Sequence, residues 1–239
     1  MTSQRDFDPV LYGATGFAGR LTAEYLAKAG GPARIALAGR SADKVRAVRD
    51  ALGESAASWT IIEADAGSPA TLAAMAARTQ VVVTTVGPYT RYGLPLVAAC
   101  VEAGTDYADL TGETPFIRDS VDQFHKQAAD TGVRIVHSCG FDSVPSDLTV
   151  YALYDKVRTD GTGELTDTDL VLRTFAGGVS GGTVASMIEF FRTAAGDPEI
   201  RRAMLDPHTL SPDRAAEPDL GNQSEPPWVA GVQVAPELA

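Results

Sequence analysis

Short apolar runs alternate with amphipathic segments over the first 140 residues. The runs are rich in β-branched residues, and continuous runs of this kind are typical of strands buried on both faces of a parallel sheet. They cover residues 7–12, 34–39, 59–64, 80–86, 105–110 and 133–138. The alternation predicts a doubly wound α/β fold with a parallel sheet in the strand order 3-2-1-4-5-6.

The segments between these strands carry apolar residues at helical spacing. Phe17, Leu21 and Tyr25 recur every fourth residue, and Val45 and Val48 share one face of the following segment. Each set indicates a helix that packs one side against the sheet. The N-cap of the second helix is predicted at a serine, Ser41, and the C-cap of a later helix at a glycine, Gly104.

The pattern changes after residue 144. A helix is predicted over residues 145–158, a strand over 169–175 and a second helix over 181–196. One strand and two helices do not close a core of their own, so we expect residues 145–196 to be a partial second α/β domain after a nucleotide-binding domain at 7–144.

The end of the chain has a different composition. Residues 197–239 hold seven of the fourteen prolines, together with several acids. This composition is typical of loops. We therefore expect a Pro-rich acidic loop or tail there, and a chain that is a truncated form of a longer protein.

Composition and charge exclude several classes of protein. The chain has 239 residues, of which 44% are hydrophobic, and its net charge of −11 repels phosphate backbones, so nucleic acid is not an expected partner. The two cysteines, Cys100 and Cys139, have no metal-binding spacing, and no metal is expected. The first residues, MTSQRDFDP, contain no apolar signal core, and no run reaches the length of about 18 apolar residues that spans a bilayer, so neither a signal peptide nor a membrane span is expected. We expect a cytoplasmic protein; association with the surface of the plasma membrane and oligomer formation are left open.

A glycine motif joins the first strand to the first helix. Its sequence is GATGFAG, with glycines at 13, 16 and 19. In this position Gly13 permits the tight turn, Gly16 lets a pyrophosphate approach the backbone, and Gly19 allows the helix to pack closely. The free N–H groups of Thr15, Phe17 and their neighbours at the helix N-terminus favour phosphate. The motif predicts a dinucleotide site.

The residue after the second strand indicates which dinucleotide binds. Enzymes that use NAD usually place an acid there, whereas this chain has Arg40, followed by Ser41. A guanidinium suits a 2′-phosphate and offers no acceptor to a ribose diol, so NADP is expected. Asp65, after the third strand, is placed near the adenine, although capping of the next helix explains it equally well.

Two loops are expected at the reacting end of the cofactor. Val86-Gly87-Pro88 follows the fourth strand and turns toward the nicotinamide, with Tyr89 as a candidate proton donor or a packing aromatic. After the sixth strand, Asp142 and Ser143 either cap the following helix or face the substrate. No tyrosine is followed four residues later by lysine, so the short-chain dehydrogenase mechanism is not expected.

Five segments together resemble the saccharopine dehydrogenase-like reductases, and among these the actinobacterial trans-acting enoyl reductases. They are GATGFAG, the Arg40 position, TTVGPY, YADLTGE and CGFDSVPSD. The resemblance implies a Rossmann domain that binds NADP, followed by a substrate domain. It also implies reduction of a carbon–carbon double bond on a carrier-bound polyketide or lipid intermediate in glycolipid biosynthesis.

Two other functions remain open on the residues. One is a saccharopine-type amino-acid (imine) dehydrogenase, for which Arg91 and Arg173 are candidate carboxylate ligands. The other is a non-catalytic NADP-binding module or truncated remnant.

We expect the 239-residue chain to bind NADPH, to expose apolar surface or self-associate, and to lack enoyl reductase turnover by itself. The predicted catalytic residues are Tyr89, Asp142 and Ser143, and the predicted cofactor-binding residues are Gly13, Thr15, Gly16, Phe17, Gly19, Arg40, Ser41, Asp65, Val86, Gly87 and Pro88.

Overall fold

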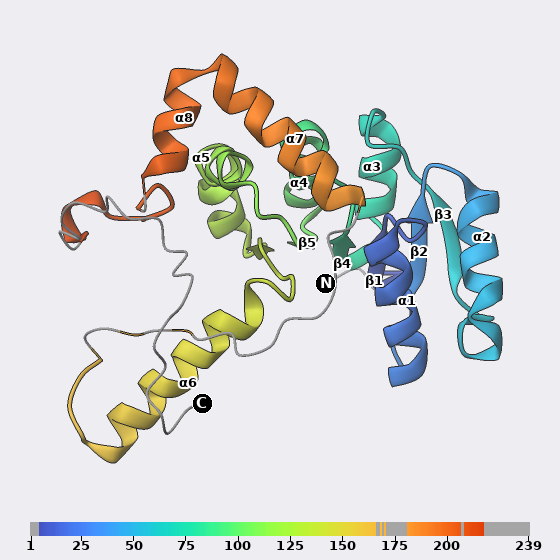
Figure 1. Ribbon diagram of the computed structural model, residues 1–239. Helices are drawn as coiled ribbons and strands as arrows, with labels where there is room; N and C mark the ends of the chain where they lie inside the picture. Colours follow the sequence, from blue (N-terminus) through green and yellow to red (C-terminus); the bar gives the residue numbers. More distant parts are fainter. Residues whose placement is uncertain (1–4, 166–167, 169, 171–180, 207, 218–239) are drawn as a thin grey trace.

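A six-stranded parallel sheet forms the centre of the protein in a computed structural model (Figure 1). The structure describes all residues except 1–4, 166–167, 169, 171–180, 207 and 218–239. The strand order is β3-β2-β1-β4-β5-β6, which confirms the predicted doubly wound topology. The strands are β1 (Phe7–Tyr12), β2 (Ala36–Gly39), β3 (Thr60–Glu63), β4 (Thr79–Thr84), β5 (Asp106–Asp109) and β6 (Ile135–Val136).

The strands end together at one edge of the sheet. Tyr12, the last residue of β1, pairs with Ala38 on one side and with Thr84 on the other. The last residues of β2, β3 and β5 reach the same level. This carboxyl edge, at the point where the strand order reverses between β1 and β4, is where doubly wound sheets bind ligands.

Five helices cover the two faces of the sheet. They are α1 (Phe17–Ala29), α2 (Ala42–Ala51), α3 (Pro69–Ala76), α4 (Tyr89–Ala103) and α5 (Thr114–Thr131), with a short 3-10 helix at Gly53–Ala56. Helices α1 and α2 lie over one face, and α3, α4 and α5 lie side by side over the other.

Alternation along β1 divides the core between these two layers. Leu11 packs with Leu37 and Val45 on the side of α1 and α2. Val10 and Tyr12 point to the opposite face, among side chains of α3, α4 and α5. Burying a side chain of this size stabilises the fold by roughly 1.5–3 kcal/mol, so both layers contribute to the stability of the same sheet.

The N-cap and C-cap predictions agree with the structure. The side chain of Ser41 accepts a hydrogen bond from the N–H of Lys44 at the start of α2. Gly104 ends α4 in the left-handed conformation. Ser68 also precedes a helix that has proline in its first turn, but its side chain makes no capping hydrogen bond.

One face of α1 differs from the prediction. Phe17, Leu21 and Tyr25 are 68%, 50% and 70% exposed, so the expectation that this apolar row packs on the sheet is wrong. The side of α1 that faces the sheet instead carries Gly19 and Ala23, which are buried, and Leu26, which is partly buried against the core on that face.

The chain after the sheet forms three helices within the described residues. They are α6 (Val144–Asp160), α7 (Gly181–Gly196) and α8 (Pro198–Leu205), followed by a 3-10 turn at Arg214–Ala216. The first two confirm the predicted helices, whereas the strand expected over 169–175 lies outside the described residues apart from Leu170. In Figure 1, α6 projects away from the sheet, while α7 and α8 lie on the side of α4 and α5.

Helix α8 corrects the expectation of a loop or tail for the start of the segment 197–239, while residues 207 and 218–239 of that segment lie outside the described residues. Asp197 caps this helix, because its Oδ1 accepts hydrogen bonds from the N–H groups of Glu199 and Ile200. Pro198 occupies the first helical position, where its missing N–H costs nothing. Proline therefore marks the start of a helix here rather than a loop. No helix in the described part of the chain is long and apolar enough to cross a membrane.

Candidate cofactor site at the carboxyl edge

The glycine loop turns sharply between β1 and α1. Gly13 has a φ of +92°, a conformation that L side chains rarely adopt. A Cβ at Gly13 would also lie 2.7 Å from the Oγ1 of Thr85 and 2.8 Å from the Cγ2 of Val86. The turn and the close approach to the loop after β4 both require glycine.

Gly16 and Gly19 differ in what surrounds them. A Cβ at Gly19 would lie 2.2 Å from the carbonyl oxygen of Gly13, so the first turn of α1 packs directly on the loop. A Cβ at Gly16 would meet no described atom closer than 3.4 Å, and Gly16 itself is exposed as the N-cap of α1. This opening lies at a helix N-terminus, which fits a pyrophosphate.

The end of β2 supplies the predicted specificity residue. Arg40 is exposed immediately after β2, and Ser41 begins α2. Next to them, Asp65 accepts a hydrogen bond at Oδ1 from the N–H of Gly67 at 2.8 Å, so it stabilises its own turn. This bond lies in the loop before α3, whose N-cap is Ser68, so capping of the helix by Asp65 is not seen, and adenine contact stays a prediction.

A buried hydroxyl lies beneath this end of the sheet. Tyr12 is 2% exposed, and among the described residues its hydroxyl has no hydrogen bond of normal geometry, although the backbone of Ala66 faces it. Burial and the nearby Asp65 carboxylate raise the pKa of Tyr12 to about 12, while Arg40 acts in the opposite direction. Tyr12 therefore keeps its proton and lies buried beside the loop that follows β3.

The loop after β4 is fixed to the glycine loop. The Oγ1 of Thr85 donates to the carbonyl oxygen of Gly13 at 3.2 Å, and the Gly87–Pro88 peptide bond is cis. A Cβ at Gly87 would lie 3.4 Å from the Oγ of Ser186, so α7 reaches over this loop. Val86, Gly87 and Pro88 therefore lie on the side of the crevice where the nicotinamide is expected.

Tyr89 does not reach the crevice. It is 4% exposed, stacks on Phe116 with ring centroids 5.7 Å apart, and donates its hydroxyl to the carbonyl oxygen of Thr84 at 3.2 Å. Burial, with Asp109 as the next cause, raises the pKa of Tyr89 well above its ordinary value. Proton donation by Tyr89 is thus disfavoured, and the structure supports the alternative of a packing aromatic.

Asp109, at the end of β5, organises the far side of the crevice. It is 2% exposed, and its Oδ1 accepts hydrogen bonds from the N–H groups of Thr111 and Ser138, each at 3.0 Å. Its Oδ2 accepts the hydroxyl of Tyr107 at 2.9 Å and lies 2.7 Å from the Nδ1 of His137. One carboxylate thereby holds two loops together.

Glu113 plays a similar part for α4. It is 4% exposed, and its carboxylate accepts hydrogen bonds from the N–H groups of Tyr89 and Thr90 at 2.9 and 2.8 Å. These are otherwise unpaired donors at the start of a helix. Asp109 and Glu113 both belong to the YADLTGE segment, but nothing in that segment indicated that both carboxylates are buried and accept hydrogen bonds from neighbouring backbone groups.

The loop between β6 and α6 carries the remaining predicted residues. His137 also lies 3.0 Å from the Oγ of Ser120, and Ser138 adopts a φ of +59°. Beyond them, Asp142 is exposed and Ser143 is half-buried at the N-cap of α6, without a capping hydrogen bond from its side chain. Capping by Ser143 is therefore not seen, and a substrate-facing role stays a prediction for both residues.

The geometry as a whole fits a dinucleotide. Arg40, the glycine loop and the loop after β4 follow the neighbouring strands β2, β1 and β4 along one edge of the sheet, which is the order in which an adenosine ribose, a pyrophosphate and a nicotinamide would meet them. A family model described as the saccharopine dehydrogenase NADP binding domain matches residues 10–136. The chain belongs to this family. Membership confirms the predicted Rossmann fold and NADP as the cofactor.

Relatives with high identity confirm the resemblance to trans-acting enoyl reductases. The trans-acting enoyl reductase of Mycobacterium tuberculosis strain H37Rv is 64% identical over 238 residues, which are 99% of this chain and 57% of the relative. A second M. tuberculosis protein, named as a candidate trans-acting enoyl reductase, is 70% identical over 235 residues. These residues are 98% of this chain and 56% of that protein. The chain thus spans little more than half the length of these relatives.

A solved structure shares the fold. Saccharopine dehydrogenase (L-Glu forming) from Saccharomyces cerevisiae aligns with a TM-score of 0.53 at 21% identity, over 65% of this chain and 32% of the yeast protein. The likeness supports the sheet architecture of the family.

Proposed function

We propose that the chain is the NADP-binding part of an enoyl reductase that reduces a carbon–carbon double bond of a carrier-bound acyl or polyketide intermediate. The identity of 64–70% to trans-acting enoyl reductases over nearly the whole chain supports this proposal most strongly. A role in glycolipid biosynthesis and docking of a carrier protein belong to the same proposal.

The proposed chemistry is conjugate reduction. NADPH, when bound, supplies a hydride to the β-carbon of an α,β-unsaturated thioester. The chain binds and orients the cofactor through the N–H groups around Gly16 and through Arg40. The cis Gly87–Pro88 turn, with Thr85 bonded to the glycine loop, fixes the wall of the crevice at its reacting end.

The α-carbon requires a proton, and the buried hydroxyl of Tyr89 is poorly placed to give it. We assign the orientation of a proton-donating water to Asp142 and Ser143, which lie on the loop that Asp109 ties to β5 through Ser138. The exposed carboxylate of Asp142 and the hydroxyl of Ser143 are the polar side chains of this loop nearest the start of α6.

Deuterium transfer tests the proposal. A chimera would join this chain to the remaining length of the 64% identical M. tuberculosis relative, and would receive deuterated NADPH and a short enoyl pantetheine thioester. We expect a saturated thioester with one deuterium at the β-carbon, and less product from Asp142→Ala and Ser143→Ala variants that still bind NADPH. A chimera that binds NADPH but leaves the thioester unchanged would contradict the proposal and favour a non-catalytic NADP-binding module. Reductive amination of a keto acid would instead favour the saccharopine-type alternative.

A further inference from the structure

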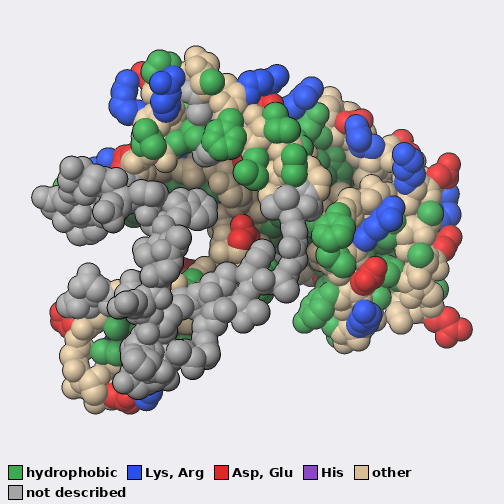
Figure 2. Space-filling model, viewed as in Figure 1, with side chains coloured by type: hydrophobic (Ala, Val, Ile, Leu, Met, Phe, Trp, Pro, Cys, Tyr) green, Lys and Arg blue, Asp and Glu red, His purple; other side chains and the backbone are tan. Residues whose placement is uncertain are grey.

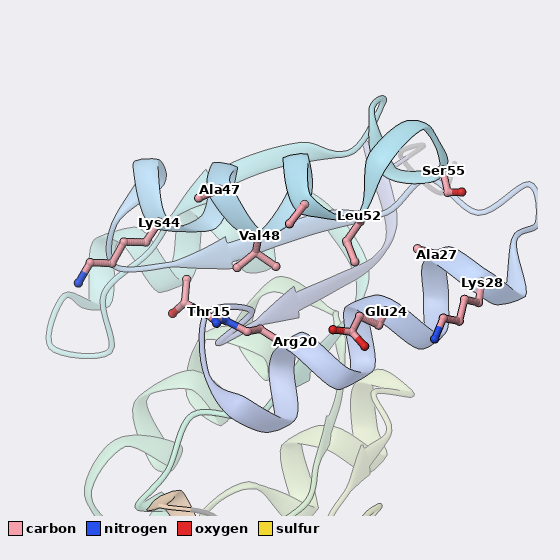
Figure 3. A pocket seen from close by; sticks show the side chains of 11 residues that line it. Thr15, Arg20, Glu24, Ala27, Lys28, Lys44, Ala47, Val48, Leu52 and Ser55 are labelled. Carbon is pink, nitrogen blue, oxygen red and sulfur yellow. The ribbon is translucent and has the colours of Figure 1, made fainter.

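A groove of about 950 Å³ separates α1 from α2 (Figure 3). Small and aliphatic side chains of the two helices line its length, and cations stand along its sides. These cations are Arg20 and Lys28 of α1 and Lys44 of α2, and Glu24 is the one acid among the lining residues, all of which are described. Such a cationic groove is unusual on a protein with a net charge of −11.

One end of the groove belongs to the cofactor site. Thr15 lies in the glycine loop, and Arg20 directly follows Gly19. In Figure 3 the side chain of Arg20 extends toward Thr15, and Lys44 lies at this same end, whereas Lys28 lies at the opposite end. The cations of the groove are therefore divided into two near the carboxyl edge of the sheet and one far from it.

The near end adjoins the predicted specificity residue. Arg40 precedes Ser41, whose hydroxyl oxygen accepts a hydrogen bond from the N–H of Lys44 at 3.4 Å, so Arg40 and Lys44 flank the same helix start. Asp43, the acid in this turn, pairs with Arg46 at 2.6 Å. Asp43 therefore has a partner on its own helix, while Lys44 lines the groove.

A 2′-phosphate needs more charge than one arginine supplies. A phosphate monoester carries about −1.5 to −2 at pH 7, so a single guanidinium neutralises roughly half to two thirds of its charge. We propose that Lys44 and Arg20 bind the 2′-phosphate of NADP together with Arg40 and so strengthen the preference for NADP over NAD. This inference rests on the NADP site and is independent of the enoyl substrate.

Adenosine fragments isolate this contact. Calorimetric titration of the full chain with 2′,5′-ADP and with 5′-AMP compares two ligands that differ in the 2′-phosphate. Lys44→Ala and Arg20→Ala should each weaken 2′,5′-ADP binding about tenfold, which is about 1.4 kcal/mol, and leave 5′-AMP binding within about twofold of the parent value because only the 2′-phosphate contact is lost. Lys28→Ala, at the far end of the same groove, is the matched control and should change neither affinity.

Each variant tests its own residue. Unchanged 2′,5′-ADP binding, or an equal loss for both ligands, would overturn the assignment for that residue. A loss in Lys28→Ala as large as in Lys44→Ala would also overturn it, because a general charge effect would then explain the result. Thermal unfolding of every variant shows whether the fold is intact. Failure of enoyl reduction would leave these titrations unaffected, so the two proposals fail separately.

Discussion

The sheet region, which runs from the start of β1 to the end of β6 (residues 7–136), differs from the helices that follow it in what its apolar side chains contact. Within the described residues, every buried apolar side chain lies between Phe7 and Val133. In α6, by contrast, no residue is buried, and Leu148, Tyr151 and Tyr154 are 51–64% exposed. The first region closes its own core around the cofactor edge, whereas the second carries apolar faces that a complete core would cover.

Figure 2 shows how charged and hydrophobic side chains are distributed on one face of the molecule. Basic and acidic side chains are interspersed over much of the described surface, and hydrophobic side chains also reach it. Helix α7 contributes Val184, Met187 and Ile188, which are 42%, 49% and 64% exposed. Such side chains are consistent with the expected tendency of the chain to self-associate, which analytical ultracentrifugation over a concentration series would measure.

The largest expected effect separates the two regions by stability. Leu72→Ala removes a side chain with 0% exposure from the core of the sheet region and should lower the free energy of unfolding by about 2–5 kcal/mol. Leu148→Ala, in α6, removes a side chain that is 56% exposed and should change it by less than about 0.5 kcal/mol. Urea unfolding of both variants measures the difference. Similar losses would show that α6 shares the core of the sheet region.

A second substitution separates binding from folding inside the sheet region. Gly16→Val places a branched side chain in the opening at the start of α1 and should abolish NADPH binding, because the pyrophosphate needs that space. Thermal stability without cofactor should change little, since a Cβ there meets no described atom within 3.4 Å. Gly19→Ala is the contrasting variant: its Cβ would clash with the carbonyl oxygen of Gly13, so it should lower stability itself. Normal NADPH binding by Gly16→Val would place the phosphate loop elsewhere.

A smaller effect concerns the choice of cofactor. Arg40→Ala should weaken NADPH binding about tenfold or more, since a charge-assisted hydrogen bond contributes about 1.5–3 kcal/mol. NADH binding should stay nearly the same, because it lacks the 2′-phosphate. Calorimetric titration with both cofactors measures this, and equal losses would refute the role of Arg40.

The two thiols provide the smallest and most local contrast. Burial raises the pKa of Cys100 to about 12 and, with Asp109, raises the pKa of Cys139 above its ordinary value. Since thiolate is the reactive form, labelling of the exposed Cys139 should be slow at pH 7 and rise as the pH passes 9. Cys100 should react only after unfolding. Rapid labelling of two thiols in the folded chain at pH 7 would contradict this picture of the sheet region.

The sequence predicted the features that depend on local patterns. The run at 7–12 became β1 without change, and the spacing of Gly13, Gly16 and Gly19 identified the turn into α1. Predictions from local sequence patterns were wrong where tertiary packing decides which face of a helix is buried. Phe17 and its helical partners read as a core face, yet close packing of Gly19 on the loop turned that row outward.

The far side of the site depends on long-range contacts that spacing does not reveal. Asp109 bonds to Ser138, 29 residues later, and Glu113 bonds to Tyr89, 24 residues earlier. Their roles become visible only when β4, β5 and β6 lie side by side. For the same reason the burial of Tyr89 beside Phe116 could not be read from its position after Pro88.

Limited proteolysis with and without NADPH tests the central claim most directly, that the sheet region alone forms the stable NADP-binding unit. We expect the first cleavages after residue 143, a resistant product that spans β1 to β6, and slower loss of that product when NADPH is present. Mass spectrometry identifies its ends, and calorimetry should show that it still binds NADPH. A resistant product that retains α6, α7 and α8, or a trimmed sheet region that no longer binds NADPH, would contradict the account.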